Sequence, residues 1–108
     1  MKKMLFISAL LTLTTTLFAN DTVVLNLVIQ DGKFIPTEFK VPADKRIEIM
    51  IDNKGPGAEE FESKDLKREK VIPAGKQAKI TINPLKKGVY KFVGEFHEAT
   101  AKGQLIVE

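Results

Sequence analysis

Residues 46–52 read Arg-Ile-Glu-Ile-Met-Ile-Asp, and this stretch decides the fold class. Ile47, Ile49 and Ile51 share one face, and the other face carries Arg46, Glu48 and Asp52, with Met50 as an apolar interruption that is expected to pack under a loop. A period of two residues is typical of a β-strand, because successive side chains point to opposite faces of a sheet. The stretch therefore predicts a half-buried strand rather than a helix.

Further strand-like runs lie on both sides of this stretch. They cover residues 23–29, 34–41, 59–63, 78–82, 90–92 and 103–108. Turn-forming sequences separate them, such as Asp31-Gly32 and residues 73–76. Pro36 cannot donate a ladder hydrogen bond, so it predicts a sheet edge or a bend within the run 34–41. About seven short strands without a helical period predict an all-β sandwich.

The N-terminal residues have a different character. Lys2 and Lys3 precede an apolar run from Met4 to Phe18, and the small residue Ala19 follows. This pattern predicts a signal peptide over residues 1–19, an exported (periplasmic) protein and one domain over residues 20–108. The alternative is an uncleaved membrane anchor, although the run is shorter than the roughly 20 residues that span a bilayer.

Charge and composition exclude several classes of function. The chain has 17 basic and 14 acidic residues, and without Lys2 and Lys3 the balance is 15 to 14, so the charge predicts no nucleic-acid partner. The absence of cysteine excludes thiolate metal sites and thiol chemistry. A single histidine, His97, excludes a site with several histidines from one chain.

The order of several segments resembles the cupredoxins. Most similar are the cupredoxin-like domains of bacterial periplasmic iron-uptake proteins, the EfeO type. The resemblance covers nearly all of residues 20–108 and rests on residues 42–45, 60–63, 69–75, 84–92 and 94–103. It implies a Greek-key β-sandwich with a metal site at one end. It also implies two partners, a periplasmic iron-binding protein and an inner-membrane iron permease.

The expected copper ligands are largely missing from the matching positions. A blue-copper centre uses two histidines, one cysteine and a weak axial methionine. The resemblance places the first histidine near Glu59 or Glu60, the cysteine at Gly94 and the methionine near Ala101 or Lys102. Only His97 matches, so copper–thiolate electron transfer is excluded.

The resemblance instead implies a group of carboxylates around the one histidine. The candidate metal ligands are Glu59, Glu60, Glu95, His97 and Glu98. Carboxylate and imidazole ligands suit an iron or Cu(II) ion better than Cu(I). Strand alternation puts Glu60 and Glu62 on one face and Glu59 with Phe61 on the other, so at most two of these glutamates reach the site. We favour Glu60 as a ligand and place Glu59 second.

Two hypotheses of function follow. The first is a metal-binding accessory protein of iron uptake, which binds a copper or iron ion and assists the oxidation or handover of ferrous iron. The second is a metal-free interaction module that docks to a transport partner. A binding protein is favoured over an enzyme, because about 90 residues of sandwich leave little room for a substrate cleft.

Overall fold

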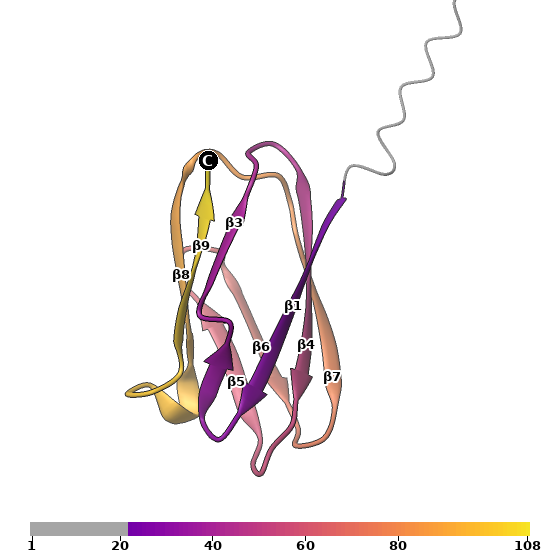
Figure 1. Ribbon diagram of the computed structural model, residues 1–108, viewed down its shortest axis with the longest axis vertical. Helices are drawn as coiled ribbons and strands as arrows, with labels where there is room; N and C mark the ends of the chain where they lie inside the picture. The colour runs from indigo at the N-terminus through magenta and orange to yellow at the C-terminus, as the bar shows by residue number, and fades with distance from the viewer. Residues whose placement is uncertain (1–21) are drawn as a thin grey trace, which may run out of the picture.

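The computed structural model describes residues 22–108, which form nine β-strands and one short 3-10 helix (Figure 1). The predicted signal peptide lies outside the described residues. The elements are β1 (Thr22–Gln30), β2 (Lys33–Ile35), β3 (Glu38–Val41), β4 (Arg46–Asn53), β5 (Glu59–Ser63), β6 (Arg68–Ile72), β7 (Gln77–Ile82), β8 (Gly88–Gly94), η2 (Glu95–His97) and β9 (Lys102–Val107).

The strands form two sheets that pack face to face. One sheet has the order β2-β1-β4-β7 and the other the order β3-β9-β8-β5-β6. β1 and β4 pair in parallel, as do β3 and β9, whereas the remaining pairs are antiparallel. The predicted fold class, an all-β sandwich, is confirmed.

The predicted strand count of about seven is too low, for two reasons. The run 34–41 is one extended segment in sequence, but it breaks at Pro36 into β2 and β3, which belong to different sheets. β6 was missed because only its last two residues, Val71 and Ile72, are apolar and most of the strand is exposed, so it lacks the apolar alternation of a half-buried strand. The bend predicted at Pro36 is therefore confirmed, with the chain crossing there from one sheet to the other.

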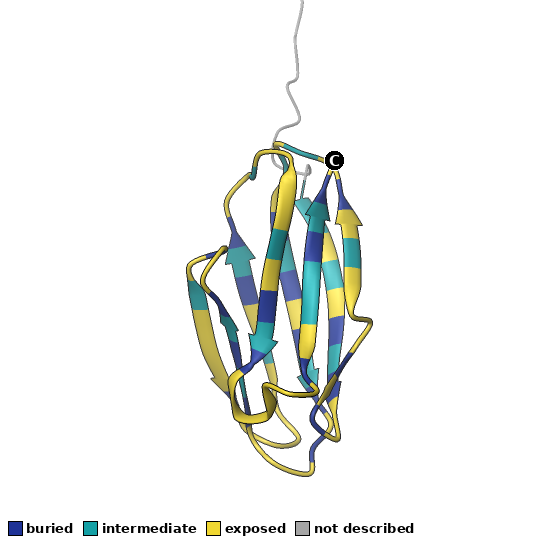
Figure 2. Cartoon of the chain, turned by 90° about the vertical axis from the view of Figure 1, so that its left-hand side faces the viewer, coloured by how far each residue is buried: buried dark blue, intermediate teal, exposed yellow. Residues whose placement is uncertain are grey.

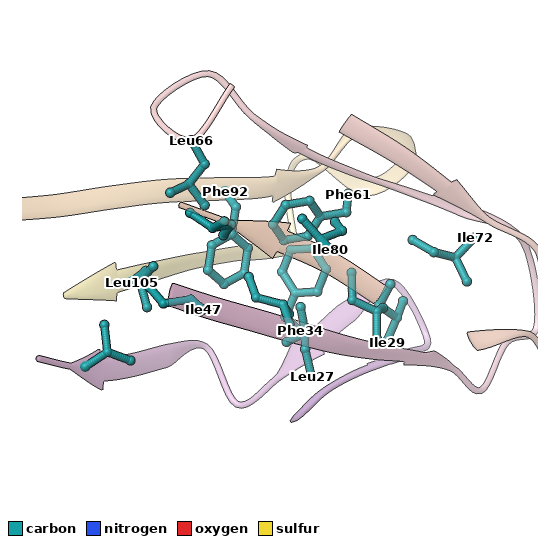
Figure 3. Packing of buried hydrophobic residues seen from close by; sticks show 14 of the residues in the cluster. Leu27, Ile29, Phe34, Ile47, Phe61, Leu66, Ile72, Ile80, Phe92 and Leu105 are labelled. Atoms are coloured by element: carbon teal, nitrogen blue, oxygen red, sulfur yellow. The ribbon is translucent and has the colours of Figure 1, made fainter. Parts of the chain in front are cut away.

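The core lies between the sheets and follows the predicted alternation. Ile47, Ile49 and Ile51 of β4 are buried, whereas Glu48 between them is half-buried and Met50 is exposed. Buried and more exposed positions alternate in the same way along other strands (Figure 2). A cluster of three aromatic side chains lies in this core (Figure 3), with ring centroids 5.1–6.4 Å apart: Phe34, Phe61 and Phe92. Aromatic pairs at such distances stabilise beyond their buried area. Tyr90 is half-buried and packs against this core, and its hydroxyl donates to the Lys86 carbonyl near the surface.

Several connections meet at one end of the sandwich, and three of them surround the predicted metal position. The β1–β2 turn, the loop from β4 to β5 and the segment from η2 to β9 lie at the end opposite the C-terminus (Figure 1). The residues predicted as metal ligands are at the second and third of these. Among residues 22–108 the structure contains no helix long and apolar enough to cross a membrane.

Candidate metal centre

The two faces of β5 separate its glutamates. Glu59, Phe61 and Ser63 point into the sandwich and are buried, whereas Glu60 and Glu62 are half-buried on the outer side. Glu59 is the first residue of β5, directly after the loop from β4, and is only 1% exposed. A carboxylate buried this deeply requires polar partners, because desolvation of an unpaired charge is costly.

Glu59 has three such partners. Its Oε1 accepts hydrogen bonds from the backbone N–H groups of Glu60 and Phe96, at 3.0 and 2.9 Å. Its Oε2 lies 2.5 Å from Nδ1 of His97. Hydrogen bonds to ionised groups are short and strong, so these contacts hold the carboxylate in one orientation. Phe96 contributes to this site through its backbone N–H group.

His97 is oriented by the opposite turn. Its imidazole ring lies against Gly32 of the β1–β2 turn, where a Cβ atom would come within 2.9 Å of Cδ2 of the ring. Thr100 donates from its hydroxyl to the Gly32 carbonyl at 2.6 Å, which ties the His97 segment to this turn. The side chain of His97 is 46% exposed, so one side of the ring meets Glu59 and another meets solvent.

A cavity of about 310 Å³ opens above this pair. Glu59 and His97 line it together with Asn53 and the loop 55–58. The Asn53 side chain holds that loop, because Nδ2 donates to the Gly57 carbonyl at 3.0 Å and Oδ1 accepts from the Gly55 N–H at 2.8 Å. The rim is therefore preorganised, with the only histidine of the chain and a buried carboxylate at its base.

The other predicted glutamates form a second group outside the cavity. Carboxylate oxygens of Glu60, Glu62 and Glu95 lie within 4.8 Å of one another. The pKa of Glu95 is raised from 4.5 to about 7, first by a hydrogen bond with Glu62, then by desolvation and by the charges of Glu62, Glu98 and Glu60. Glu98 lines a groove of about 370 Å³ next to Glu62 and Glu95. A proton on Glu95 therefore relieves part of the repulsion within this group.

The predicted site thus divides into two parts. Glu59 and His97 meet in the cavity. Glu60, Glu95 and Glu98 belong to the outer acidic group, which also contains Glu62. We expected Glu60 to be the first ligand and Glu59 the second, and the structure places Glu59 beside His97. The signal was present, because the alternation that puts Glu59 on the same face as a core phenylalanine also points it inward.

A blue-copper centre does not fit these residues. Gly94 stands where its cysteine is expected, and a Cβ atom there would lie 2.6 Å from the Ala101 Cβ and 2.8 Å from the Glu59 Cδ. At the position where the axial methionine is expected, the chain has Ala101, which is buried and has no sulfur atom. The donor set is one carboxylate and one imidazole, without thiolate or thioether.

These features define a β-sandwich with a polar centre beneath the loops at one end. Residues 3–107 match the family described as "Cupredoxin-like domain", and the chain belongs to that family. A protein of Rickettsia prowazekii (strain Madrid E), named as uncharacterized, is 40% identical over 89 residues, which cover 82% of this chain and 71% of the relative.

Solved copper proteins share the fold. The metal-binding domain of the Streptococcus pneumoniae Cu(I)-exporting P-type ATPase CopA is 15% identical, with a TM-score of 0.70 over 82% of this chain and 88% of that chain. Auracyanin A, a "blue" copper protein of Chloroflexus aurantiacus, is 13% identical, with a TM-score of 0.69 over 81% and 99%. At these identities the likeness concerns the fold alone, and the iron-uptake subgroup stays a prediction.

Proposed function

We propose that this chain is an exported metal-handling protein that binds one iron or Cu(II) ion between Glu59 and His97. The observation that carries the proposal is the convergence of Glu59 Oε2 and His97 Nδ1 at the base of a solvent-facing cavity. Oxygen and imidazole donors suit these ions and disfavour Cu(I).

An open site of this kind suits handover better than storage. Oε1 of Glu59 is already engaged by two backbone N–H groups, so the chain supplies one oxygen and one nitrogen. Most coordination positions are then left to water or to donors of another protein. The acidic group formed by Glu60, Glu62, Glu95 and Glu98 lies beside the cavity, and a surface of one charge raises the local concentration of cations.

We place this activity in iron uptake, as a periplasmic accessory protein. The N-terminal sequence supports export, and the resemblance to iron-uptake domains supports a periplasmic iron-binding protein and an inner-membrane permease as partners. Anionic oxygen favours Fe(III) over Fe(II), because the ion of higher charge gains more from it. The centre would thus hold Fe(III) more tightly than Fe(II), which favours the one-electron oxidation of each ferrous ion by an external oxidant such as dioxygen.

A metal-free interaction module is the second candidate, and one observation favours it. Glu59 has its three partners without any ion, and no buried side-chain nitrogen or oxygen within residues 22–108 lacks a hydrogen-bond partner. A cupredoxin-like sandwich whose buried polar side chains are all hydrogen-bonded without an ion would serve as a docking surface for a transport protein.

Titration of the purified chain separates the two candidates. Cu(II), Zn(II) and, without oxygen, Fe(II) would be titrated by calorimetry into the wild type and the variants His97→Ala and Glu59→Gln. We expect one saturable site, weakened about tenfold or more in both variants, since each removes a direct ligand. The control is Glu38→Gln, which changes an exposed carboxylate on β3 and should leave affinity unchanged.

The outer acidic group requires its own variant. Glu95→Gln removes a carboxylate of that group and leaves the Glu59–His97 pair intact. Binding that is lost in Glu95→Gln but retained in His97→Ala would contradict our assignment. Binding no tighter than the millimolar range, about 10⁻³ M, would favour the metal-free module.

A further inference from the structure

We infer that the Glu59 carboxylate occupies the space that a side-chain ligand at position 94 would need. A buried glutamate at position 59 and a side chain at position 94 are therefore mutually exclusive. Together, Glu59 and Gly94 close the centre to metal binding through sulfur. The spatial exclusion does not depend on any bound ion. Its consequence for the kind of cation that is bound rests on the proposed function.

The exclusion follows from the pairing of β5 with β8. Phe61 lies opposite Gly94 in the register of these strands, and Glu59 precedes Phe61 on the same inward face. A Cβ atom built at position 94 would lie 2.8 Å from Cδ and 2.9 Å from Oε2 of Glu59. Such distances are well inside van der Waals contact, so one of the two groups would have to move.

Neither group moves easily. The Glu59 carboxylate is held by the N–H groups of Glu60 and Phe96 and by His97. On the other side, the Gly94 N–H donates to the Ala101 carbonyl at 2.8 Å, which closes the segment between β8 and β9. Displacing the carboxylate would break short hydrogen bonds of a buried charge.

Glycine at this position is explained by space and not by backbone conformation. Gly94 has φ −89° and ψ 108°, an extended conformation that any residue adopts. Gly32, by contrast, has φ +70°, where a side chain is disfavoured whatever the space. What keeps position 94 free of a side chain is therefore its neighbours Glu59 and Ala101.

A double-mutant cycle tests the exclusion without any metal. The folded-to-unfolded equilibrium of the full chain would be measured by urea unfolding for the wild type, Gly94→Ala, Glu59→Ala and the double variant. We expect Gly94→Ala to lower the equilibrium constant about tenfold more in the wild-type background than in the Glu59→Ala background. The contact with Ala101 is the same in both backgrounds, so it cancels in the cycle.

Gly57→Ala is the matched control, because a Cβ atom there has nothing within 4 Å and should act independently of Glu59. Additive effects of Gly94→Ala and Glu59→Ala, within about a factor of two, would overturn the inference. If Glu59→Ala does not fold, Glu59→Asp withdraws the carboxyl group by one methylene and takes its place. If Gly94→Ala alone does not fold, recovery of folding in the double variant supports the inference, and its failure to recover contradicts it.

A second arm tests the consequence for ligands. Co(II) would be added to Gly94→Cys combined with Ala101→Gly, and to the same variant with Glu59→Ala as well, and the thiolate-to-metal absorption band recorded. Ala101→Gly removes from both proteins the Cβ atom that would lie 2.6 Å from a Cβ at position 94. We expect the band only in the variant that also carries Glu59→Ala. A band in the variant that keeps Glu59, or in neither protein, would overturn the claim that Glu59 excludes a sulfur ligand. Weak metal binding by the wild type, in contrast, would affect only the proposed function.

Discussion

Glu59 and Glu95 carry the same side chain but meet opposite surroundings. Glu59 is buried, and its charge is matched by two backbone N–H groups and the His97 imidazole. Glu95 is exposed, yet it faces Glu62, Glu60 and Glu98, which raise its pKa to about 7. For Glu95, a hydrogen bond with Glu62, desolvation and the charges of neighbouring glutamates therefore raise the pKa of a side chain that lies at the surface.

Glu95 leads to a prediction about pH. Its pKa is raised on folding, so the folded state binds more protons than the unfolded state between pH 4.5 and about 7. The contribution of Glu95 to stability is therefore present at low pH and lost as the pH rises through this window. We expect Glu95→Gln to remove this part of the pH dependence, measured by urea unfolding at about pH 5 and about pH 8. Glu38→Gln is the control, and an unchanged slope in Glu95→Gln would contradict the prediction.

At the scale of elements, β5 and η2 perform different tasks at the same centre. β5 places Phe61 in the core and Glu59 beneath the cavity from the same face. η2 contributes the backbone N–H of Phe96 and the His97 ring, while the Phe96 side chain stays 51% exposed. β5 thus links the centre to the hydrophobic core, and η2 supplies two groups that hydrogen-bond to the Glu59 carboxylate.

This division predicts different costs for two phenylalanine substitutions. Phe61→Ala empties part of the cluster with Phe34 and Phe92, so it should lower the free energy of unfolding by about 3–5 kcal/mol. Phe96→Ala removes an exposed ring and should change it by less than about 0.5 kcal/mol. Urea unfolding measures both. Similar losses would mean that the Phe96 ring is as important to the fold as the core.

At the scale of the whole molecule, the packing of two sheets brings distant residues together. Glu59 and His97 are separated by 38 positions, and Gly32 and Thr100 by 68. The first contact forms the centre and the second holds its histidine. The first contact arises within one sheet, where β5 pairs with β8. The second depends on the β1–β2 turn of the other sheet lying against the segment between β8 and β9.

The proposed role also requires export of the whole chain. The positive start and the short apolar run predict cleavage after Ala19. Intact mass spectrometry of the protein recovered from the exported fraction should therefore show a chain that begins at Asn20. Recovery with residues 1–19 attached, in the membrane fraction, would instead support the anchor alternative.

Much of the fold could be predicted because its signals are local. The alternation of residues 46–52 and the proline at position 36 act within a few residues, and both predictions were confirmed. β6 was missed because an exposed strand lacks apolar alternation. The alternation also separates Glu59 from Glu60, but it does not show which face of the strand meets His97, because that contact joins residues 38 positions apart.

The sequence by itself determined a β-sandwich with one histidine, no thiol and a group of glutamates near the expected metal position. Only the tertiary structure decided which glutamate meets His97 and which ones repel each other on the outer side. The physical reason is that side-chain alternation is local, whereas the contact of Glu59 with His97 and the lack of space at Gly94 arise only when β5 pairs with β8.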